Sequence, residues 1–154
     1  MRALNTIEQD FWNQYLRALP DKQQPQNPVV IASMAGDKRI ADQLLEKYLD
    51  GRKIAASGLL AGYQKKHHRL PQINDYWIIL SADEVPRCIV RTIHVEFNQF
   101  KDISERIALA EADDSLQNWR QIHQDFFTPY LPDLNITNLE TTEIFTEFFE
   151  VVYR

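Results

Sequence analysis

The chain has 154 residues, of which 44% are hydrophobic and 25% are charged, and its formal net charge is −5. This length and composition predict one globular domain whose core needs neither disulfides nor metals. The single cysteine, Cys88, excludes an internal disulfide and a thiolate metal cluster, and a lone thiol favours a reducing compartment. Residues 1–16 lack the apolar stretch of a signal peptide, and no apolar run is long enough for a membrane span. We therefore expect a cytoplasmic protein without a membrane segment.

Charge is distributed unevenly along the chain. Residues 51–74 contain five basic and no acidic residues, whereas residues 100–154 contain eleven acidic and four basic residues. The basic residues of the first segment are Arg52, Lys53, Lys65, Lys66 and Arg69, and His67 and His68 lie among them. A concentrated basic segment in an acidic chain is the pattern that would direct a polyanion to one place on the surface.

The first predicted helix covers residues 6–19, where apolar residues recur at helical spacing. Thr6 followed by Gln9 predicts a capping box at its start, and Pro20 ends it because proline has no N–H to continue the hydrogen bonding. The next segment, 20–28, contains three prolines in nine residues and is predicted to be a loop.

Residues 29–36 form a short apolar run that predicts a strand. A second helix is predicted to begin at Asp37 and to end before Gly51, because glycine is favoured directly after a helix C-terminus. Its expected buried stripe consists of Ile40, Ala41, Leu44, Leu45 and Tyr48. Small residues then recur between positions 55 and 62, which permits close approach of backbone or ligand.

Two strands are predicted next, joined by a hairpin loop at residues 81–86. Residues 76–80 are continuously apolar, as in a strand that is buried on both faces. Residues 87–97 alternate, and the residues expected on one face are Ile89, Ile93, Val95 and Phe97. Arg91 falls on the same face, where it must be paired or face a cavity, because burying a lone guanidinium is costly.

The last part of the chain predicts a short helix at residues 103–110, a longer helix from Ser115 and a strand over residues 143–154. The inner face of the longer helix is predicted to carry Leu116, Trp119, His123, Phe126 and Phe127. Trp119 and His123 are interpreted as core residues. Consecutive strands followed by helices predict an α+β fold around a small sheet or barrel.

Several short elements resemble motifs of one known family, in their order and in their spacing. Residues 51–56 read Gly-Arg-Lys-Ile-Ala-Ala, which is similar to a Gly-x-Lys-Thr-Ala-Thr element after a helix. Residues 74–80 read Asn-Asp-Tyr-Trp-Ile-Ile-Leu, which is similar to a Gly-Asp-Tyr turn entering an apolar strand. Residues 88–92, Cys-Ile-Val-Arg-Thr, resemble the strand that follows, and residues 108–113, Ala-Leu-Ala-Glu-Ala-Asp, resemble an Ala-x-x-Glu-Gly-Glu element.

Residues 119–127 resemble a Trp-Arg-x-x-His-x-x-Phe-Phe helix, and residues 149–153 resemble a closing Phe-Glu-Val-Val-Tyr strand. Together these elements are similar to those of the ASCH domain family. The resemblance implies a PUA-like small β-barrel with flanking helices over residues 28–154, and it leaves residues 1–27 as an N-terminal extension of a helix and a loop. It also implies an association with RNA. Some members are implied to be amidohydrolases acting on an acetylated cytidine, and others to cleave RNA.

The resemblance implies three working groups in the amidohydrolase members, and this chain keeps two of them. Lys53 and Glu111 match the lysine and the glutamate, but the second threonine of the motif is replaced by Ala56. Ser57 is the nearest hydroxyl, and in an extended segment it lies on the same face as Lys53. We therefore take Lys53, Glu111 and Ser57 as candidate catalytic residues. The alternatives are a surface lysine, a solvated acid at a helix end and a turn serine.

The candidate nucleic-acid-binding residues are Arg52, Tyr63, Lys65, Lys66, Arg69 and Arg91. The basic residues between positions 65 and 69 could form a track for a phosphate backbone, with Tyr63 stacking on a base. The alternative is a solvated loop. Arg91 could bind a phosphate or a base edge, or it could form a structural ion pair with Glu111 or Glu96. No metal site and no cofactor is predicted.

Three functional hypotheses follow. The first is a module that binds RNA or a modified nucleoside in a cleft lined by Lys53, Glu111 and Arg91. The second is a hydrolase, and here ribonuclease activity is favoured over amidohydrolysis, because the 2′-OH of RNA can replace the missing threonine hydroxyl as the nucleophile. The third is a non-catalytic protein-interaction domain that uses the acidic half of the chain. The sequence predicts no oligomeric state.

Overall fold

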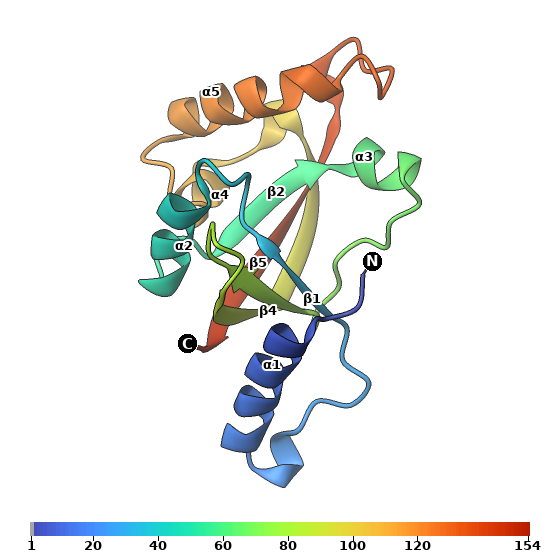
Figure 1. Ribbon diagram of the computed structural model, residues 1–154. Coiled ribbons are helices and arrows are strands. Elements are labelled where there is room, and N and C mark those ends of the chain that lie inside the picture. The colour runs from blue at the N-terminus through green and yellow to red at the C-terminus, as the bar shows by residue number, and fades with distance from the viewer. Residues whose placement is uncertain (1) are drawn as a thin grey trace. The chain divides into compact units, whose positions relative to one another are not determined.

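The computed structural model describes residues 2–154 and shows an α+β protein with one mixed five-stranded sheet (Figure 1), which confirms the predicted class. The strands are β1 Val30–Met34, β2 Ala55–Leu59, β3 Tyr76–Leu80, β4 Pro86–Gln99 and β5 Glu143–Tyr153, and their order in the sheet is β1-β3-β4-β5-β2. The α-helices are α1 Thr6–Ala18, α2 Ala41–Leu49, α3 Leu60–Lys65, α4 Glu105–Ala110 and α5 Leu116–Phe127. The short 3₁₀ helices are η1 Asp21–Gln23, η2 Phe100–Asp102, η3 Thr128–Tyr130 and η4 Leu139–Thr141. Within residues 2–154, no helix combines the length and the apolarity needed to cross a bilayer.

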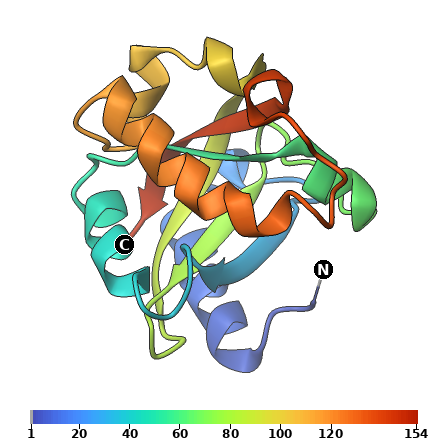
Figure 2. The same ribbon diagram turned by 90° about the horizontal axis from the view of Figure 1, so that it is seen from above.

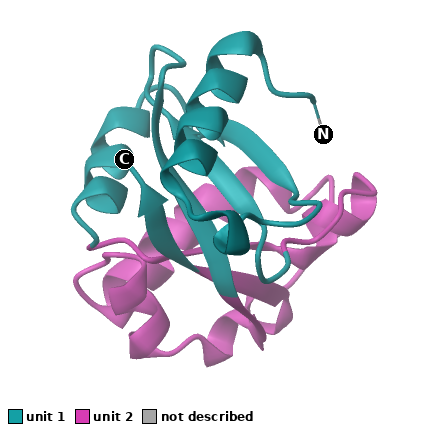
Figure 3. Cartoon of the chain, turned by 90° about the horizontal axis from the view of Figure 1, so that it is seen from below, with its two compact units in different colours: residues 1–51, 72–93, 149–154 teal, residues 52–71, 94–148 magenta. Residues whose placement is uncertain are grey.

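The chain divides into two compact units, which Figure 3 colours separately. Unit 1 comprises residues 1–51, 72–93 and 149–154, and unit 2 comprises residues 52–71 and 94–148. Strands β4 and β5 each contribute residues to both units.

Unit 1 is built on β1, β3, the first part of β4, the end of β5, and the helices α1 and α2. β1 runs parallel to β3, with Val30 opposite Tyr76, and β3 runs antiparallel to β4 through the predicted hairpin. The predicted bounds of β3 agree with the structure. Its side chains are mostly buried, and the strand occupies an interior position of the sheet, between β1 and β4. The core of this unit contains Trp12, Tyr15, Tyr76, Ile78, Leu80 and Ile89.

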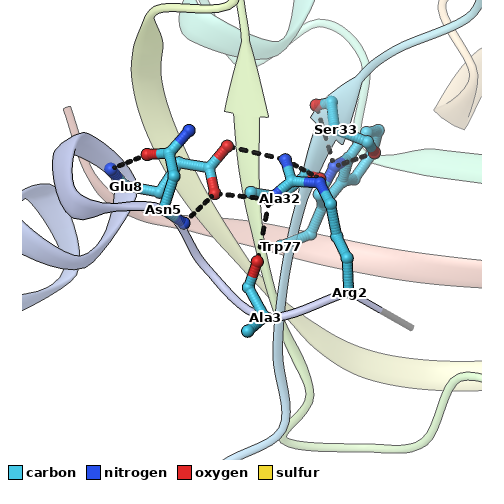
Figure 4. A network of polar contacts seen from close by, with 7 residues as sticks. All are labelled: Arg2, Ala3, Asn5, Glu8, Ala32, Ser33 and Trp77. Carbon is cyan, nitrogen blue, oxygen red and sulfur yellow. Dashed lines mark hydrogen bonds and ion pairs between the residues drawn. The ribbon is translucent and has the colours of Figure 1, made fainter.

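Helix α1 carries its cap one residue earlier than predicted. Asn5 is the N-cap, because its side chain accepts the backbone N–H of Glu8 at 2.9 Å while the Glu8 carboxylate accepts the backbone N–H of Asn5 at 2.9 Å. Glu8 is 1% exposed and is also held by the Arg2 guanidinium at 2.6 and 2.7 Å (Figure 4). Arg2 donates further to the carbonyl of Ala32 at 3.2 Å, which fastens the N-terminal segment to β1.

The second helix begins later than predicted. The Asp37 side chain accepts the backbone N–H groups of Arg39 and Ile40, which forms a separate turn, and α2 begins only at Ala41. The end of the helix agrees with the prediction, because Gly51 has φ of +80° and its N–H donates to the carbonyl of Tyr48.

The predicted face of β4 is wrong in its second half, where Ile93 is 44% and Phe97 is 50% exposed. In the first half, three consecutive residues, Cys88, Ile89 and Val90, are all buried. Both faces of β4 are therefore covered there, so alternation in the sequence does not identify a single inner face.

Unit 2 pairs β2 antiparallel to β5, with Ala55 opposite Phe148 and Leu59 opposite Ile144. Helix α5 begins after Ser115, whose hydroxyl accepts the backbone N–H of Asn118 as an N-cap. The core of this unit is formed by Ala55, Leu59, Phe100, Ile103, Ile107, Ala108, Trp119, Phe127, Ile144 and Phe148. The predicted inner position of Phe126 is wrong, because this residue lies at the edge of the buried stripe of α5 and is 52% exposed.

Candidate functional site

Glu111 lies at the C-terminal end of α4, in a turn that fixes its position. It is the C-cap residue, and the next residue, Ala112, has φ of +62°. The N–H of Ala112 donates to the carbonyl of Leu109, and the N–H of Asp113 donates to the carbonyl of Ala108, both at 3.0 Å. These two bonds define a Schellman motif, so the backbone that carries Glu111 is held at both sides.

The Glu111 carboxylate is buried and receives hydrogen bonds from two segments of unit 2. It is 3% exposed. The Ser57 hydroxyl donates to Oε2 at 2.7 Å, and the backbone N–H of Ser57 donates to Oε1 at 3.2 Å. The indole N–H of Trp119 donates to Oε2 at 2.5 Å. Because both oxygens are engaged, the carboxylate has one fixed orientation.

Lys53 and His123 complete this cluster. The Lys53 amine lies 3.6 Å from Glu111 Oε1 and donates to the Glu111 carbonyl at 3.2 Å, where the C-terminal end of α4 also favours positive charge. His123 Nε2 lies 3.3 Å from the same Oε1. The other ring nitrogen of His123, Nδ1, lies 2.8 Å from the carbonyl of Trp119, which can only accept. Both ring nitrogens of His123 therefore face acceptor atoms.

The charge state of Glu111 follows from these contacts. Burial alone raises the pKa of a carboxyl, but the His123 hydrogen bond, the charges of Lys53 and His123 and the Trp119 hydrogen bond lower the pKa of Glu111 to about 2. The carboxylate is thus ionised at neutral pH and is a weak base. It holds and orients its neighbours more readily than it accepts a proton.

Ser57 links the cluster to β5. Thr146 is its cross-strand partner, and the two hydroxyl oxygens are 2.7 Å apart. Because the ionised Glu111 accepts the Ser57 proton, Thr146 must donate to Ser57, so the chain of donors runs from Thr146 through Ser57 to Glu111. The side chain of Ala56 points to the opposite face of β2, as alternation requires. The hydroxyl beside Glu111 therefore comes from Ser57.

The basic residues 65–69 follow α3 in a turn of defined shape. His67 has φ of +52°, its N–H donates to the carbonyl of Gln64, and the N–H of His68 donates to the carbonyl of Tyr63. These bonds form a second Schellman motif. All five residues, Lys65 to Arg69, are exposed.

The remaining sequence-predicted residues have different surroundings. Tyr63 is half-buried and packs edge-on against Phe145 with 4.7 Å between ring centroids, and burial raises the pKa of its hydroxyl. Arg52 is exposed in unit 2. Arg91 belongs to unit 1, where its guanidinium pairs with Glu150 and donates to the Asn74 side chain at 3.2 Å. The expected pairing of Arg91 is thus present, with Glu150 as its acid in place of Glu111 or Glu96.

The sequence does not predict that Trp119, His123 and Thr146 belong to the Glu111 cluster. The first two were interpreted as core, and they are buried, but their polar atoms also contact Glu111. Thr146 had no signal in the sequence, because its contact with Ser57 depends on the register between β2 and β5. Among residues 2–154, no three His, Cys, Asp or Glu side chains are grouped so that they could hold a metal ion.

Solved structures with this fold define the class of the protein. The ASCH domain from Lactobacillus crispatus JV V101 is 27% identical, with a TM-score of 0.92 over 99% of this chain and 98% of that one. Protein EF3133 from Enterococcus faecalis V583 is 28% identical, with a TM-score of 0.80 over 94% of this chain and 87% of that one. Hypothetical protein PH0355, at 13% identity and a TM-score of 0.51 over 80% of this chain and 98% of that one, shares the fold alone.

The chain belongs to the ASCH domain family, whose model matches residues 31–153. This membership confirms the resemblance stated above, and the α+β architecture is consistent with the predicted PUA-like fold. A comparison with functionally curated proteins finds no match.

Proposed function

We propose that this ASCH domain binds RNA or a modified nucleotide through unit 2. The observation that carries the proposal is the exposed basic turn after α3, which we call the basic turn and which consists of residues 65–69. It concentrates positive charge in a chain whose net charge is −5. Its Schellman motif orders the backbone that carries the cations. A phosphate backbone should bind such a preorganised turn more tightly than a flexible loop, because less entropy is lost on binding.

The state of Glu111 supports binding over catalysis. Its carboxylate contacts five donor groups, from Ser57, Trp119, Lys53 and His123, and its pKa is about 2. A general base works best with a pKa near the operating pH, and Glu111 is far below it. We therefore assign the Glu111 cluster a positioning role, in which it holds β2 and α4 beside the segment that carries the basic turn.

The direct test compares two charge-matched triple variants. The first replaces Lys65, Lys66 and Arg69 with glutamine. The control makes the same replacement at three exposed cations of unit 1, Arg17, Lys22 and Lys38. Binding of a labelled RNA should weaken by about tenfold or more in the first variant and change little in the control. Equal affinity in the two variants would remove the basic turn from the proposal.

A second candidate function, hydrolysis of an N-acyl group on a nucleoside, is supported by Ser57. This residue supplies a hydroxyl that donates to Glu111 at 2.7 Å, in a cluster that also contains the Lys53 amine. The family motif has a threonine hydroxyl where this chain has Ala56, and Ser57 supplies a hydroxyl in its place. In this function the Ser57 oxygen would bond to the acyl carbon, and the C–N bond would break as the Ser57 proton passes to the departing nitrogen. Water would then hydrolyse the acyl-serine, while Lys53 and Glu111 hold the charges around it.

Replacement of Ser57 separates the two hydrolytic alternatives. Ser57→Ala should abolish deacylation, and Ser57→Thr should retain part of it. Cleavage of RNA uses the 2′-OH of the substrate and should persist in Ser57→Ala. Deacylation of an N-acetylated cytidine at the wild-type rate by Ser57→Ala would exclude Ser57 as the nucleophile.

A further inference from the structure

Three large apolar side chains follow one face of α5 into η3, and we call them the aromatic stripe. Ile122, Phe126 and Tyr130 are 52%, 52% and 53% exposed, respectively. They recur every four residues, so they project from one side of the helix, along the edge of the buried stripe that contains Trp119 and His123. The rings of Phe126 and Tyr130 lie 6.0 Å apart with an interplanar angle of 55°.

The aromatic stripe lies next to the basic turn within unit 2. The Lys65 amine donates to the backbone carbonyl of Asp133, which is three residues beyond Tyr130. Figure 2 shows the end of α5 and the segment after it beside α3, in agreement with this contact. The segment that follows the aromatic stripe therefore contacts the first residue of the basic turn.

Charge distinguishes these two parts of unit 2, the aromatic stripe and the basic turn. Asp125 and Asp133 are exposed in the same segment as the stripe, so the stripe itself does not attract phosphates. The basic turn beside it does. A ligand that fits both parts has an anionic backbone and flat groups that can turn away from that backbone to stack on rings. An unpaired nucleic-acid strand has both features. In a duplex the bases are stacked on each other and cannot reach the rings.

We propose that the aromatic stripe stacks the bases of single-stranded RNA, while the basic turn binds the adjoining phosphates. This inference rests on the proposed function and specifies it, because it selects unpaired strands over duplexes. Phe126 and Tyr130 act as stacking groups and Ile122 supplies an apolar edge. Tyr63, which packs against Phe145, takes no part in stacking.

The size of the stripe argues against a protein partner. Three half-exposed side chains offer roughly 300 Å², whereas a specific protein interface buries about 800 Å² on each partner. Two or three stacked bases need only the area that the stripe provides. Stacking contributes about 1–3 kcal/mol per base, so loss of both rings should weaken binding by about 30-fold or more.

The test uses a 12-nucleotide RNA of mixed sequence, labelled with a fluorophore, alone and annealed to its complement. Affinity is measured by fluorescence anisotropy for the wild type, for Phe126→Ala/Tyr130→Ala, and for Phe97→Ala. Phe97 is a matched control, because it is a 50% exposed phenylalanine elsewhere in unit 2. All replaced side chains are on the surface, and thermal unfolding of each variant verifies the fold.

We expect the double variant to lose about 30-fold or more in affinity for the single strand and to bind the duplex as the wild type does. The control should bind both as the wild type does. An unchanged single-strand affinity in the double variant would overturn the stacking assignment, while the loss on neutralising the basic turn would still stand. A wild type that binds neither RNA would instead overturn the proposed function. A wild-type dimer that the double variant converts to a monomer would assign the stripe to self-association and overturn the inference.

Discussion

Replacement of Glu111 by glutamine should cost about 3–5 kcal/mol of stability at pH 7, because it breaks a buried charged cluster. Lys53 and His123 lose the anion they face, and their side chains are only 11% and 10% exposed. The new amide also places an N–H₂ group among donors from Ser57 and Trp119. The pKa gives a similar magnitude, because a shift from 4.5 to about 2 corresponds to about 3 kcal/mol.

The pH dependence has a defined sign. The folded-state pKa of Glu111 is lowered, so the unfolded chain binds the proton first as the pH falls. The contribution of Glu111 is therefore fully present above about pH 4.5 and is lost as the pH falls toward about 2. The stability difference between wild type and Glu111→Gln should shrink across that window.

Urea unfolding followed by tryptophan fluorescence measures this difference from pH 7 down to pH 3. Glu143→Gln is the matched control, because Glu143 is an exposed glutamate of unit 2 and its replacement should change stability by less than about 0.5 kcal/mol. A loss below about 1 kcal/mol for Glu111→Gln at pH 7 would refute the reasoning, given the 3–5 kcal/mol expected. A loss that stays constant down to pH 3 would refute the pKa argument.

Three further predictions concern single residues. Ala112→Gly should raise the free energy of unfolding by about 0.5–1 kcal/mol in urea titrations. Ala112 has a left-handed φ, and the strain relieved there exceeds the entropy that glycine adds to the unfolded chain. A free energy of unfolding below that of the wild type would contradict this. Arg2→Ala should lower it by about 2 kcal/mol, because the buried Glu8 carboxylate loses two charged hydrogen bonds. Cys88 is 0% exposed and burial raises the pKa of its thiol to about 11, so a thiol reagent at pH 8 should label it only after unfolding. Rapid labelling of the native protein would contradict its burial.

Local signals predicted the elements whose structure depends on local sequence. The continuous apolar run gave β3 its bounds, and Pro20 and Gly51 marked helix ends. The sequence predicts no helix at α3, because Gly58 and Gly62 weaken any helical pattern around it. Gly58 is needed there for packing, since a Cβ would lie 2.9 Å from the ring of Phe145.

The candidate site was predictable only in part, because its contacts join residues far apart in the chain. The family resemblance brought Lys53 and Glu111 together, and the structure places their charged groups 3.6 Å apart. The partner of Arg91 is Glu150, on another strand, and no local pattern identifies it. Thr146 reaches Ser57 only through strand pairing. Left-handed backbone at Asn74 and Ala112, where the family motifs have glycine, shows that both turns keep their geometry without it.

The salt dependence of RNA binding reports how many phosphate contacts the basic turn makes. RNA affinity is measured between about 50 and 200 mM salt, a range in which phosphate contacts strongly affect affinity. The proteins compared are the wild type, the variant neutralised at Lys65, Lys66 and Arg69, and the control neutralised at Arg17, Lys22 and Lys38. Each lost phosphate contact on a single strand reduces the slope of log affinity against log salt by about 0.7. The slope should be shallower by about 2 for the basic-turn variant and unchanged for the control. Identical slopes in all three proteins would contradict phosphate binding by the basic turn.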